Sequence, residues 1–261
     1  MRHQALRGSP APTNKIPVKQ TDSILYRGNY FRKITPEVAR RIPMIIDSDG
    51  EKLIADIFDN ELKPGQKDRF RQQIEFILEV DKLKHVLRQT LLMDTSRREN
   101  SAEHSWHIAL TVMILSEYAR DAEIDFFRVM KILLIHDLIE IDAGDTYCYD
   151  DQGRKDQAAR EQLAAERIFN LLPSDQARIF RDLWDEFEEK KTPESRFANA
   201  LDRVQPFLHN YFTRGQTWQE NDIKSGQVKT RMQPVDDGAP VLWKYVSALM
   251  DDAVNKGFLA D

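Results

Sequence analysis

The sequence contains a single cysteine, Cys148, so no internal disulfide can form. The absence of a disulfide framework fits a reducing compartment, and we interpret Cys148 itself as an ordinary thiol. The sequence also lacks an apolar run long enough to span a membrane, and its first residues lack the apolar core of a secretory signal. These absences predict a cytoplasmic protein with no membrane partner.

An excess of positive charge is missing as well. The chain has 38 Lys and Arg residues against 43 Asp and Glu, which gives a formal net charge of −5 and no basic footprint for a nucleic acid polymer. Hydrophobic residues at 41% and charged residues at 31% are ordinary for a globular protein, and the length suffices for a sizeable core. We find no internal repeat and expect one large domain that acts on a small molecule.

The N-terminal part differs from the rest in composition. Residues 1–22 hold three prolines, few apolar residues and no acid before Asp22, which predicts a disordered tail; a transit peptide is the alternative. Residues 23–66 mix β-branched runs with an Asp-Gly turn and a short helical stretch. The sequence of this extension does not indicate what role it has. We assign residues 67–261 to a helical domain.

Helical periodicity dominates from residue 67 onward, because apolar residues recur three and four positions apart. Asn100 and Glu103 form a capping box before one helix, and Gly144 is a typical stop signal for the next. No stretch convincingly predicts a β-sheet, so we expect an all-α fold. The predicted helices span 67–88, 100–119, 125–144, 155–172, 174–190, 193–212 and 240–256, with loops near 173, 192–193 and 221–239.

One predicted helix carries titratable groups where apolar residues are expected. Residues 132–141 read ILLIHDLIEI and are apolar nearly all round, which is typical of a buried helix. At about 100° per residue, Glu140 lies between His136 and Asp137, one turn further along. A divalent cation supplies the charge that such buried groups need and accepts imidazole and carboxylate ligands. We therefore prefer a metal site to a surface ion pair or a satisfied core histidine.

Two more candidate ligands lie on other predicted helices. His104 is on the inward face of the preceding helix, and Asp202 is on the inward face of a later one. Pro206 removes the backbone hydrogen bond to the carbonyl of Asp202, which predicts a bend there. We interpret His107 and His209 as structural, since His209 lies about 10 Å along the helix from Asp202, too far to share an ion.

This ligand set resembles that of the HD-domain metal-dependent phosphohydrolases. The motifs ENSAEHS and HDLIEIDAGD, with LKHVLRQTLL before them and NALDRV after, are similar to the branch that contains the bacterial 5'-deoxynucleotidases, over about residues 67–215. The resemblance implies a helical bundle, often a homodimer, that removes phosphate from a deoxynucleoside monophosphate. It also implies one divalent ion, such as Mn, Co, Zn, Fe or Mg, bound by His104, His136, Asp137 and Asp202.

The resemblance assigns further roles by position. Glu140 matches the catalytic carboxylate, Asp145 matches an acid of the substrate loop with catalytic and substrate-binding roles, and Arg88 matches the arginine that binds phosphate. Gln89 follows Arg88, where some members have tryptophan. We place Gln89 in substrate binding and expect this difference to alter the orientation of the phosphate.

The implied chemistry agrees with what these residue types do. A bound divalent metal lowers the pKa of a water molecule and draws charge from a phosphoryl oxygen, so no covalent nucleophile is required. Glu140 can manage a proton, and the planar fork of Arg88 can hold phosphate. Arg97 and Arg98, in the adjacent loop, add positive field.

Two alternatives stay open at this point. The same ligands suit a mononuclear HD hydrolase that acts on another nucleotide or on another phosphomonoester. A scaffold that only binds nucleotides is less favoured, because neither a ligand nor Glu140 is lost. No histidine lies between Asp137 and Asp202, which disfavours the relatives that hold a second metal.

Overall fold

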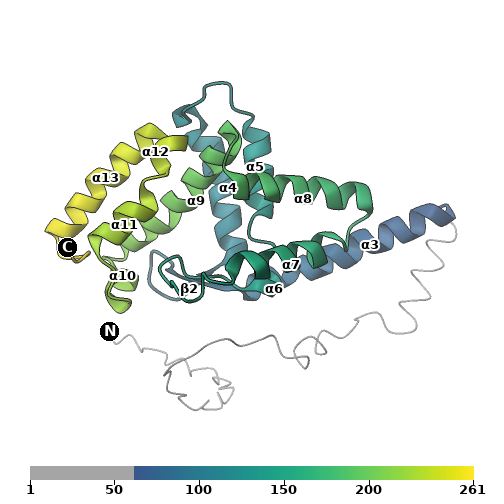
Figure 1. Cartoon of the computed structure of the whole chain (residues 1–261), viewed down its shortest axis with the longest axis horizontal. Coiled ribbons are helices and arrows are strands. Elements are labelled where there is room, and N and C mark those ends of the chain that lie inside the picture. The colour runs from purple at the N-terminus through teal and green to yellow at the C-terminus, as the bar shows by residue number, and fades with distance from the viewer. Residues whose placement is uncertain (1–61) are drawn as a thin grey trace, which may run out of the picture. The chain divides into compact units, whose positions relative to one another are not determined.

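The computed structural model describes residues 62–261, so the predicted tail at 1–22 and nearly all of the extension at 23–66 lie outside the described residues. The described chain is helical apart from one small sheet, which confirms the predicted all-α class (Figure 1). None of its helices has the length and apolar character to cross a membrane. The elements are α3 (Pro64–Val80), η1 (Asp81–His85), β1 (Leu87–Leu91), β2 (Arg98–Asn100), α4 (Ser101–Leu115), η2 (Ser116–Tyr118), α5 (Phe126–Ile135), α6 (Glu140–Ala143), α7 (Gln157–Phe169), α8 (Ser174–Glu189), α9 (Pro193–Phe212), α10 (Gln216–Glu220), α11 (Ser225–Met232), α12 (Val235–Gly238) and α13 (Pro240–Asn255).

Helix α9 is the central element of the bundle. It contacts β1 and the helices α4, α5, α8, α10, α11, α12 and α13. Its first turn is fixed by Thr192, whose hydroxyl accepts a hydrogen bond from the Ser195 N–H at 3.1 Å. Its fully buried side chains include Phe197, Ala198, Ala200 and Leu201. Because neighbours surround α9, a polar residue on it, such as Asp202, faces other helices instead of solvent.

Several helices lie where periodicity and capping predict them. Helices α8, α9 and α13 agree with the predicted spans to within one residue. Helix α4 begins after the expected capping box, in which Asn100 Oδ1 accepts from the Glu103 N–H at 2.9 Å and Glu103 Oε2 accepts from the Asn100 N–H at 3.2 Å. Helix α9 continues through Pro206 to Phe212, and the bend expected there stays a prediction.

The predicted helix over 67–88 is wrong at its C-terminal end. Helix α3 ends at Val80, and β1 follows η1 and pairs antiparallel with β2. The turn between the strands is built on Asp94, whose carboxylate accepts from the Ser96 N–H at 3.0 Å, and Thr95 adopts a positive φ of 60°. The strands pair through Leu87 with Asn100 and Leu91 with Arg98, with an irregularity in the register between these pairs. Arg88 therefore lies on a strand, β1, that contacts α9.

The single helix predicted over 125–144 is also wrong, because it is interrupted at the candidate site residues. Helix α5 ends at Ile135, residues 136–139 form turns, and α6 ends at Gly144 as expected, with φ of 76°. The Leu138 N–H donates to Ile135 O at 3.0 Å, and the Glu140 N–H donates to Asp137 O at 3.0 Å. These bonds span three residues instead of four. Side chains three apart eclipse in such a turn, which brings Glu140 over Asp137.

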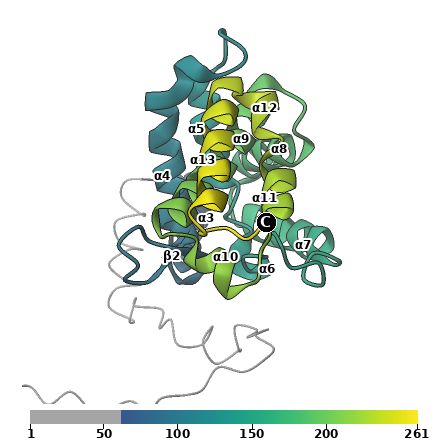
Figure 2. The same ribbon diagram turned by 90° about the vertical axis from the view of Figure 1, so that its left-hand side faces the viewer.

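The region 221–239, predicted as a loop, contains α11 and α12, and the short α10 precedes it. Figure 2 shows α11, α12 and α13 together on the face toward the viewer. Helix α12 packs against α9 so closely that a Cβ on Gly238 would lie 2.2 Å from the carbonyl oxygen of Arg196. Only glycine fits this contact. The short helices thereby bring residues of α11 to the C-terminal half of α9.

Candidate metal centre and its cavity

His104 is completely buried and is held from both ring nitrogens. Its Nδ1 is 2.9 Å from Gln205 Oε1, and its Nε2 is 3.1 Å from Asp202 Oδ1. The capping box of α4 fixes the helix start four residues earlier and so sets the direction of this side chain. Because Gln205 Oε1 only accepts hydrogen bonds, the proton of the neutral imidazole is on Nδ1. The lone pair of Nε2 therefore points toward Asp202.

His136 has the same arrangement at the end of α5. Its Nδ1 is 2.8 Å from the carbonyl oxygen of Leu133, which accepts the Nδ1 proton. Its Nε2 is 3.0 Å from Asp137 Oδ1 and 3.7 Å from Asp202 Oδ1. This Nε2 is buried and makes no well-aligned hydrogen bond within residues 62–261. A buried polar atom without a partner is rare, so His136 indicates a ligand that the protein itself does not supply.

The four predicted ligands come together. Donor atoms of His104, His136 and Asp137 lie within 4.8 Å of one another, and Asp202 reaches both imidazoles. Two Nε2 lone pairs that face two carboxylates repel them unless a cation lies between. Histidine whose other nitrogen is held by a carbonyl or amide oxygen is the usual arrangement of a metal ligand. The residues present therefore fit a divalent ion.

The electrostatics of the cluster agree with this fit. Burial and the nearby charge of Arg88 lower the pKa of His104 to about 4, so this imidazole is neutral near pH 7. Burial opposes a charge on His136, but Asp137 and Asp202 outweigh burial and raise its pKa well above the usual range. Burial raises the pKa of Asp202, but the two nearby imidazoles, including the charge on His136, outweigh burial and hold the pKa of this carboxyl group well below its usual value. A proton on His136 Nε2 occupies the place that a cation would take.

Two further carboxyl groups border the cluster. Glu140 Oε2 accepts a hydrogen bond from the Ser101 hydroxyl at 2.6 Å. Burial, with the charges of Asp137 and Asp145, raises the pKa of Glu140 well above its usual value. Burial also raises the pKa of Asp145, while Arg88 acts in the opposite direction. Glu140 and Asp145 thus form a buried acidic pair in which the pKa of each carboxyl group is raised.

Arg88 reaches the cluster from β1. Its Nη1 donates to Asp137 Oδ2 at 2.8 Å and lies 4.0 Å from Asp145 Oδ1, while its buried Nε has no hydrogen-bond partner among the described residues. Gln89 lines the same cavity, and its side-chain oxygen accepts from Arg98. Arg97 pairs with Glu103 at 2.6 Å, at the surface. Neither Arg97 nor Arg98 lines the cavity, so neither would contact a ligand bound in it. The positive field expected from them stays a prediction.

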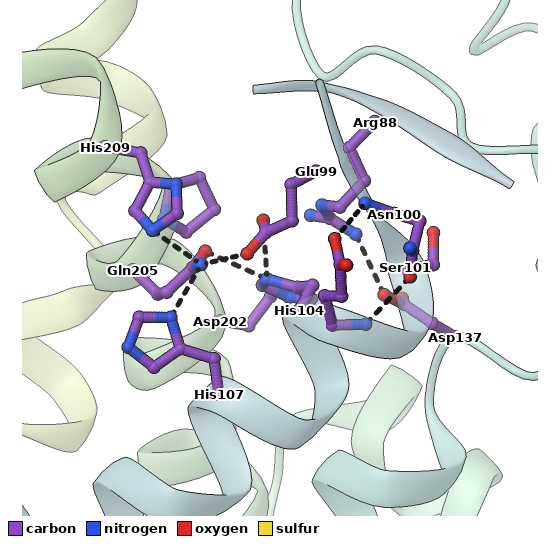
Figure 3. Close-up of polar contacts among 12 residues, drawn as sticks. Arg88, Glu99, Asn100, Ser101, His104, His107, Asp137, Asp202, Gln205 and His209 are labelled. Atoms are coloured by element: carbon purple, nitrogen blue, oxygen red, sulfur yellow. Dashed lines mark hydrogen bonds and ion pairs between the residues drawn. The ribbon is translucent and has the colours of Figure 1, made fainter. Parts of the chain in front are cut away.

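Gln205 links the cluster to a second polar group that sequence reasoning missed. Its Nε2 donates to Glu99 Oε1 at 2.7 Å and lies 3.2 Å from His107 Nδ1 and 3.1 Å from His209 Nε2 (Figure 3). These three residues also converge closely enough to suggest a metal group. The amide nitrogen, however, lies among their acceptor atoms, where an ion would have to bind. We interpret the group as the support that orients Gln205, and through it His104.

The cluster opens into a cavity of about 900 Å³. Two of the arginines on its wall approach Asp202 and were not predicted: Arg203, next to Asp202 on α9, and Arg231 on α11. Burial and the charge of Arg231 lower the pKa of Arg203 to about 10. The position of Arg203 beside a candidate ligand, in the motif NALDRV, was a usable sequence signal, whereas Arg231 comes from a region without clear periodicity. The cavity is lined by both acidic and basic residues and has room for more than an ion.

Comparison with known proteins identifies the family. A family model described as "HD domain" matches residues 80–243. The chain belongs to the HD-domain family. This assignment agrees with the resemblance expected from the sequence motifs, and the matched segment extends from the end of α3 into α13.

Individual relatives add detail to the family assignment. This HD-domain protein is 27% identical to "5'-deoxynucleotidase HDDC2" of Homo sapiens over 139 residues, 53% of this chain and 66% of the human protein, so it spans just under two thirds of that length. It is 30% identical to "5'-deoxynucleotidase HDDC2" of Dictyostelium discoideum over 131 residues, 48% of this chain and 69% of that protein. Among solved structures, a "predicted metal-dependent phosphohydrolase" from Magnetospirillum magnetotacticum is 48% identical, with a TM-score of 0.73 over 76% of this chain and 99% of that one.

The Gln205 contacts generate a prediction about metal affinity. Gln205→Met keeps the size of the side chain and removes the acceptor for the Nδ1 proton of His104. We expect the affinity of the apoprotein for Mn²⁺ or Co²⁺ to fall about 10–100-fold, measured by calorimetric titration, because an imidazole without its partner is no longer held in the right tautomer.

His107→Ala is the matched control. It removes a different contact of Gln205 and leaves the bond to His104 intact, so its metal affinity should stay close to that of the wild-type protein. The circular dichroism spectrum and melting temperature of both variants check the fold. Wild-type metal affinity in folded Gln205→Met would show that Gln205 does not support the site.

Proposed function

We propose that this HD-domain protein is a metal-dependent phosphohydrolase that removes the 5'-phosphate from deoxynucleoside monophosphates. The observation that carries the proposal is the convergence of the two imidazole Nε2 atoms on Asp202, beside Asp137 and the phosphate-binding candidate Arg88. The names of the human and Dictyostelium relatives support the substrate class. The 48% identical Magnetospirillum protein, described as metal-dependent, supports the dependence on metal.

In this proposal His104, His136, Asp137 and Asp202 hold one divalent ion, with Mn, Co, Zn, Fe or Mg as candidates. The mixture of imidazole nitrogen and carboxylate oxygen suits all of these metals, so the donor set does not choose among them. When bound, such an ion lowers the pKa of a water molecule and polarises a phosphoryl oxygen.

The protein's own groups complete the reaction. Burial and its acidic neighbours raise the pKa of Glu140, which favours the protonated carboxyl group, and this group can donate a proton to the leaving 5'-oxygen. Arg88 binds phosphate oxygens through its planar guanidinium, and Asp145 orients the substrate beside Glu140. Gln89, held by Arg98 at the cavity wall, takes part in substrate binding.

A cytoplasmic location belongs to the same proposal. The lone Cys148 is partly buried, and burial raises the pKa of its thiol, so it stays protonated and unreactive near pH 7. A nucleotide phosphatase with an unreactive single thiol suits a reducing compartment.

Phosphate release is the direct test of this function. Metal-free protein, reloaded in turn with each candidate metal, should release inorganic phosphate from deoxynucleoside 5'-monophosphates and lose this activity on addition of a chelator. Ribonucleotides, triphosphates, cyclic nucleotides and simple phosphomonoesters complete the substrate panel. Asp202→Ala is the inactive control and should lack stoichiometric metal while it keeps its helical spectrum. No phosphate from any deoxymonophosphate, or preferential cleavage of a triphosphate, would contradict the proposal.

The variant Glu140→Gln separates binding from proton transfer. The ligand set is complete without Glu140, so the metal content and the substrate affinity should be retained. The rate constant kcat should fall about 10²–10⁴-fold, the usual worth of general acid–base catalysis, with little change in KM.

Glu161→Gln is the matched control, because Glu161 lines the same cavity and the pKa of its carboxyl group is also raised by burial. Its kcat should stay near the wild-type value. Metal stoichiometry, melting temperature and kcat are measured on one preparation. A drop in metal content of Glu140→Gln would make Glu140 a ligand instead, and a near wild-type kcat in the fully loaded variant would remove it from the mechanism.

We also propose that the protein forms a homodimer through α4. The residues Trp106, Leu110, Met113 and Ile114 recur at helical spacing along one side of α4 and are 41–64% exposed. An apolar stripe of this kind is typical of an interaction surface, and a second copy buries it without another partner.

Sedimentation velocity tests the dimer directly. The wild-type protein should sediment as a dimer, and Met113→Glu should sediment as a monomer because it places a charge in the stripe. Leu163→Glu changes an equally exposed apolar residue on α7 and should leave the dimer intact. A wild-type protein that is monomeric at high concentration would refute the proposal.

A further inference from the structure

Two arginines on the cavity wall, Arg203 and Arg231, approach the candidate ligand Asp202 from the side opposite the imidazoles. Arg203 follows Asp202 on α9, and its side chain is only 9% exposed. Its Nε donates to the backbone carbonyl oxygen of Arg231 at 3.0 Å, which ties α9 to α11. The guanidinium of Arg231, whose side chain is 35% exposed, approaches the same carboxylate oxygen as the guanidinium of Arg203. Holding two like charges this close is costly unless an anion accompanies them.

Asp202 is the carboxylate nearest to both arginines. Its Oδ2 lies 3.7 Å from Arg203 Nη1 and 3.8 Å from Arg231 Nη2, while its Oδ1 faces the imidazoles of the metal centre. Both distances are longer than a hydrogen bond. Within the described part of the chain, no other carboxylate forms an ion pair with either arginine. A single carboxylate, which also faces the metal centre, is therefore the partner of two guanidinium groups and forms a hydrogen bond with neither.

Arg203 and Arg231 differ from Arg88 in that their guanidinium N–H groups are not used in hydrogen bonds within residues 62–261, apart from Arg203 Nε. Arg88 Nη1 already donates to Asp137 at 2.8 Å. The terminal nitrogens of Arg203 and the guanidinium of Arg231 make no hydrogen bond to residues 62–261, although they line the cavity. A nearly buried guanidinium with unused donors that border a cavity is a site built for an oxyanion.

The charge of Asp202 points to the same ligand. A divalent ion bound at the centre would take up the charges of Asp137 and Asp202, so Asp202 would no longer balance the two guanidinium groups that approach its Oδ2. A phosphate oxyanion in the cavity would neutralise them in its place.

We propose that Arg203 and Arg231 form a second phosphate-binding element, which holds the scissile phosphate of the substrate and the inorganic phosphate product beside the metal centre. The assignment rests on the proposed phosphohydrolase function and deepens it. The two oxygens of a single carboxylate separate these guanidiniums from the imidazole Nε2 atoms, so one phosphate group can contact the arginines while it lies at the metal centre. Arg88 supplies a third guanidinium to the same group.

Binding of inorganic phosphate tests the proposal without turnover. The metal-loaded protein is titrated calorimetrically with inorganic phosphate, and the metal-loaded Glu140→Gln variant is titrated with a deoxynucleoside monophosphate and with the corresponding deoxynucleoside. Arg203→Gln and Arg231→Gln should each raise the Kd for phosphate and for the monophosphate about 10–100-fold, the worth of a lost charge-assisted hydrogen bond. The Kd for the deoxynucleoside and the metal content should not change. Arg203→Lys should give an intermediate Kd, because lysine keeps the charge and loses the fork.

Arg154→Gln is the matched control, because Arg154 lines the same cavity, is exposed and forms no ion pair with the centre. Its phosphate affinity should stay at the wild-type level. If Arg203→Gln loses metal or fails to fold, Arg231→Gln decides the question from a separate helix. Unchanged phosphate affinity in Arg231→Gln would overturn the proposal, and so would an effect restricted to di- or triphosphates. If wild-type protein binds phosphate but hydrolyses no monophosphate, the proposed function fails while the phosphate element stands.

Discussion

The constraint on which the site depends is the direction of two imidazole lone pairs. The Nδ1 protons of His104 and His136 are held by Gln205 and by the carbonyl of Leu133, so both Nε2 lone pairs face carboxylates inside the protein. Carboxylates and lone pairs repel each other, and water has little access to separate them. The fold is stable around this arrangement only with a positive charge at its centre, supplied either by a proton on His136 or by a metal ion. Proton and metal therefore compete for one position, as expected for imidazole ligands.

The break between α5 and α6 serves this constraint. A continuous α-helix would place residues three apart at an angle to each other, whereas the tightened turn after Ile135 brings Glu140 close enough to Asp137 for their charges to interact. A candidate ligand carboxylate and an acid with a raised pKa are then neighbours. The same turn leaves the His136 ring at the end of the helix, where its Nδ1 reaches back to Leu133 O at 2.8 Å. The local departure from helical geometry is thus part of how the site is made.

The sequence predicts those features that depend on periodicity and on local signals. His104 and Asp202 were predicted because each lies on the inward side of a predicted helix, strongly patterned in the case of Asp202, and α4 begins at the capping box of Asn100 and Glu103. The strand that carries Arg88 was missed, because its neighbours repeat at helical spacing and only the turn at Asp94 indicates a hairpin. Gln205 was missed for another reason. Its importance lies in contacts with Glu99 and His104, about a hundred positions away in the chain, and periodicity carries no information about such contacts.

Arg231 could not be predicted either, since nothing in a short helix of mixed residues distinguishes an arginine that faces a cavity from one that faces solvent. Its position depends on the hydrogen bond from Arg203 to its backbone carbonyl oxygen and on the close packing of α12 on α9. Arginines also lie behind both candidate carboxylate ligands, with Arg88 against Asp137 and the pair on α9 and α11 against Asp202. A guanidinium that turns from a carboxylate to a phosphate leaves that carboxylate with more negative charge for the metal. Under the proposed function, metal and phosphate therefore strengthen each other's binding, and by thermodynamic reciprocity this coupling is the same whichever binds first.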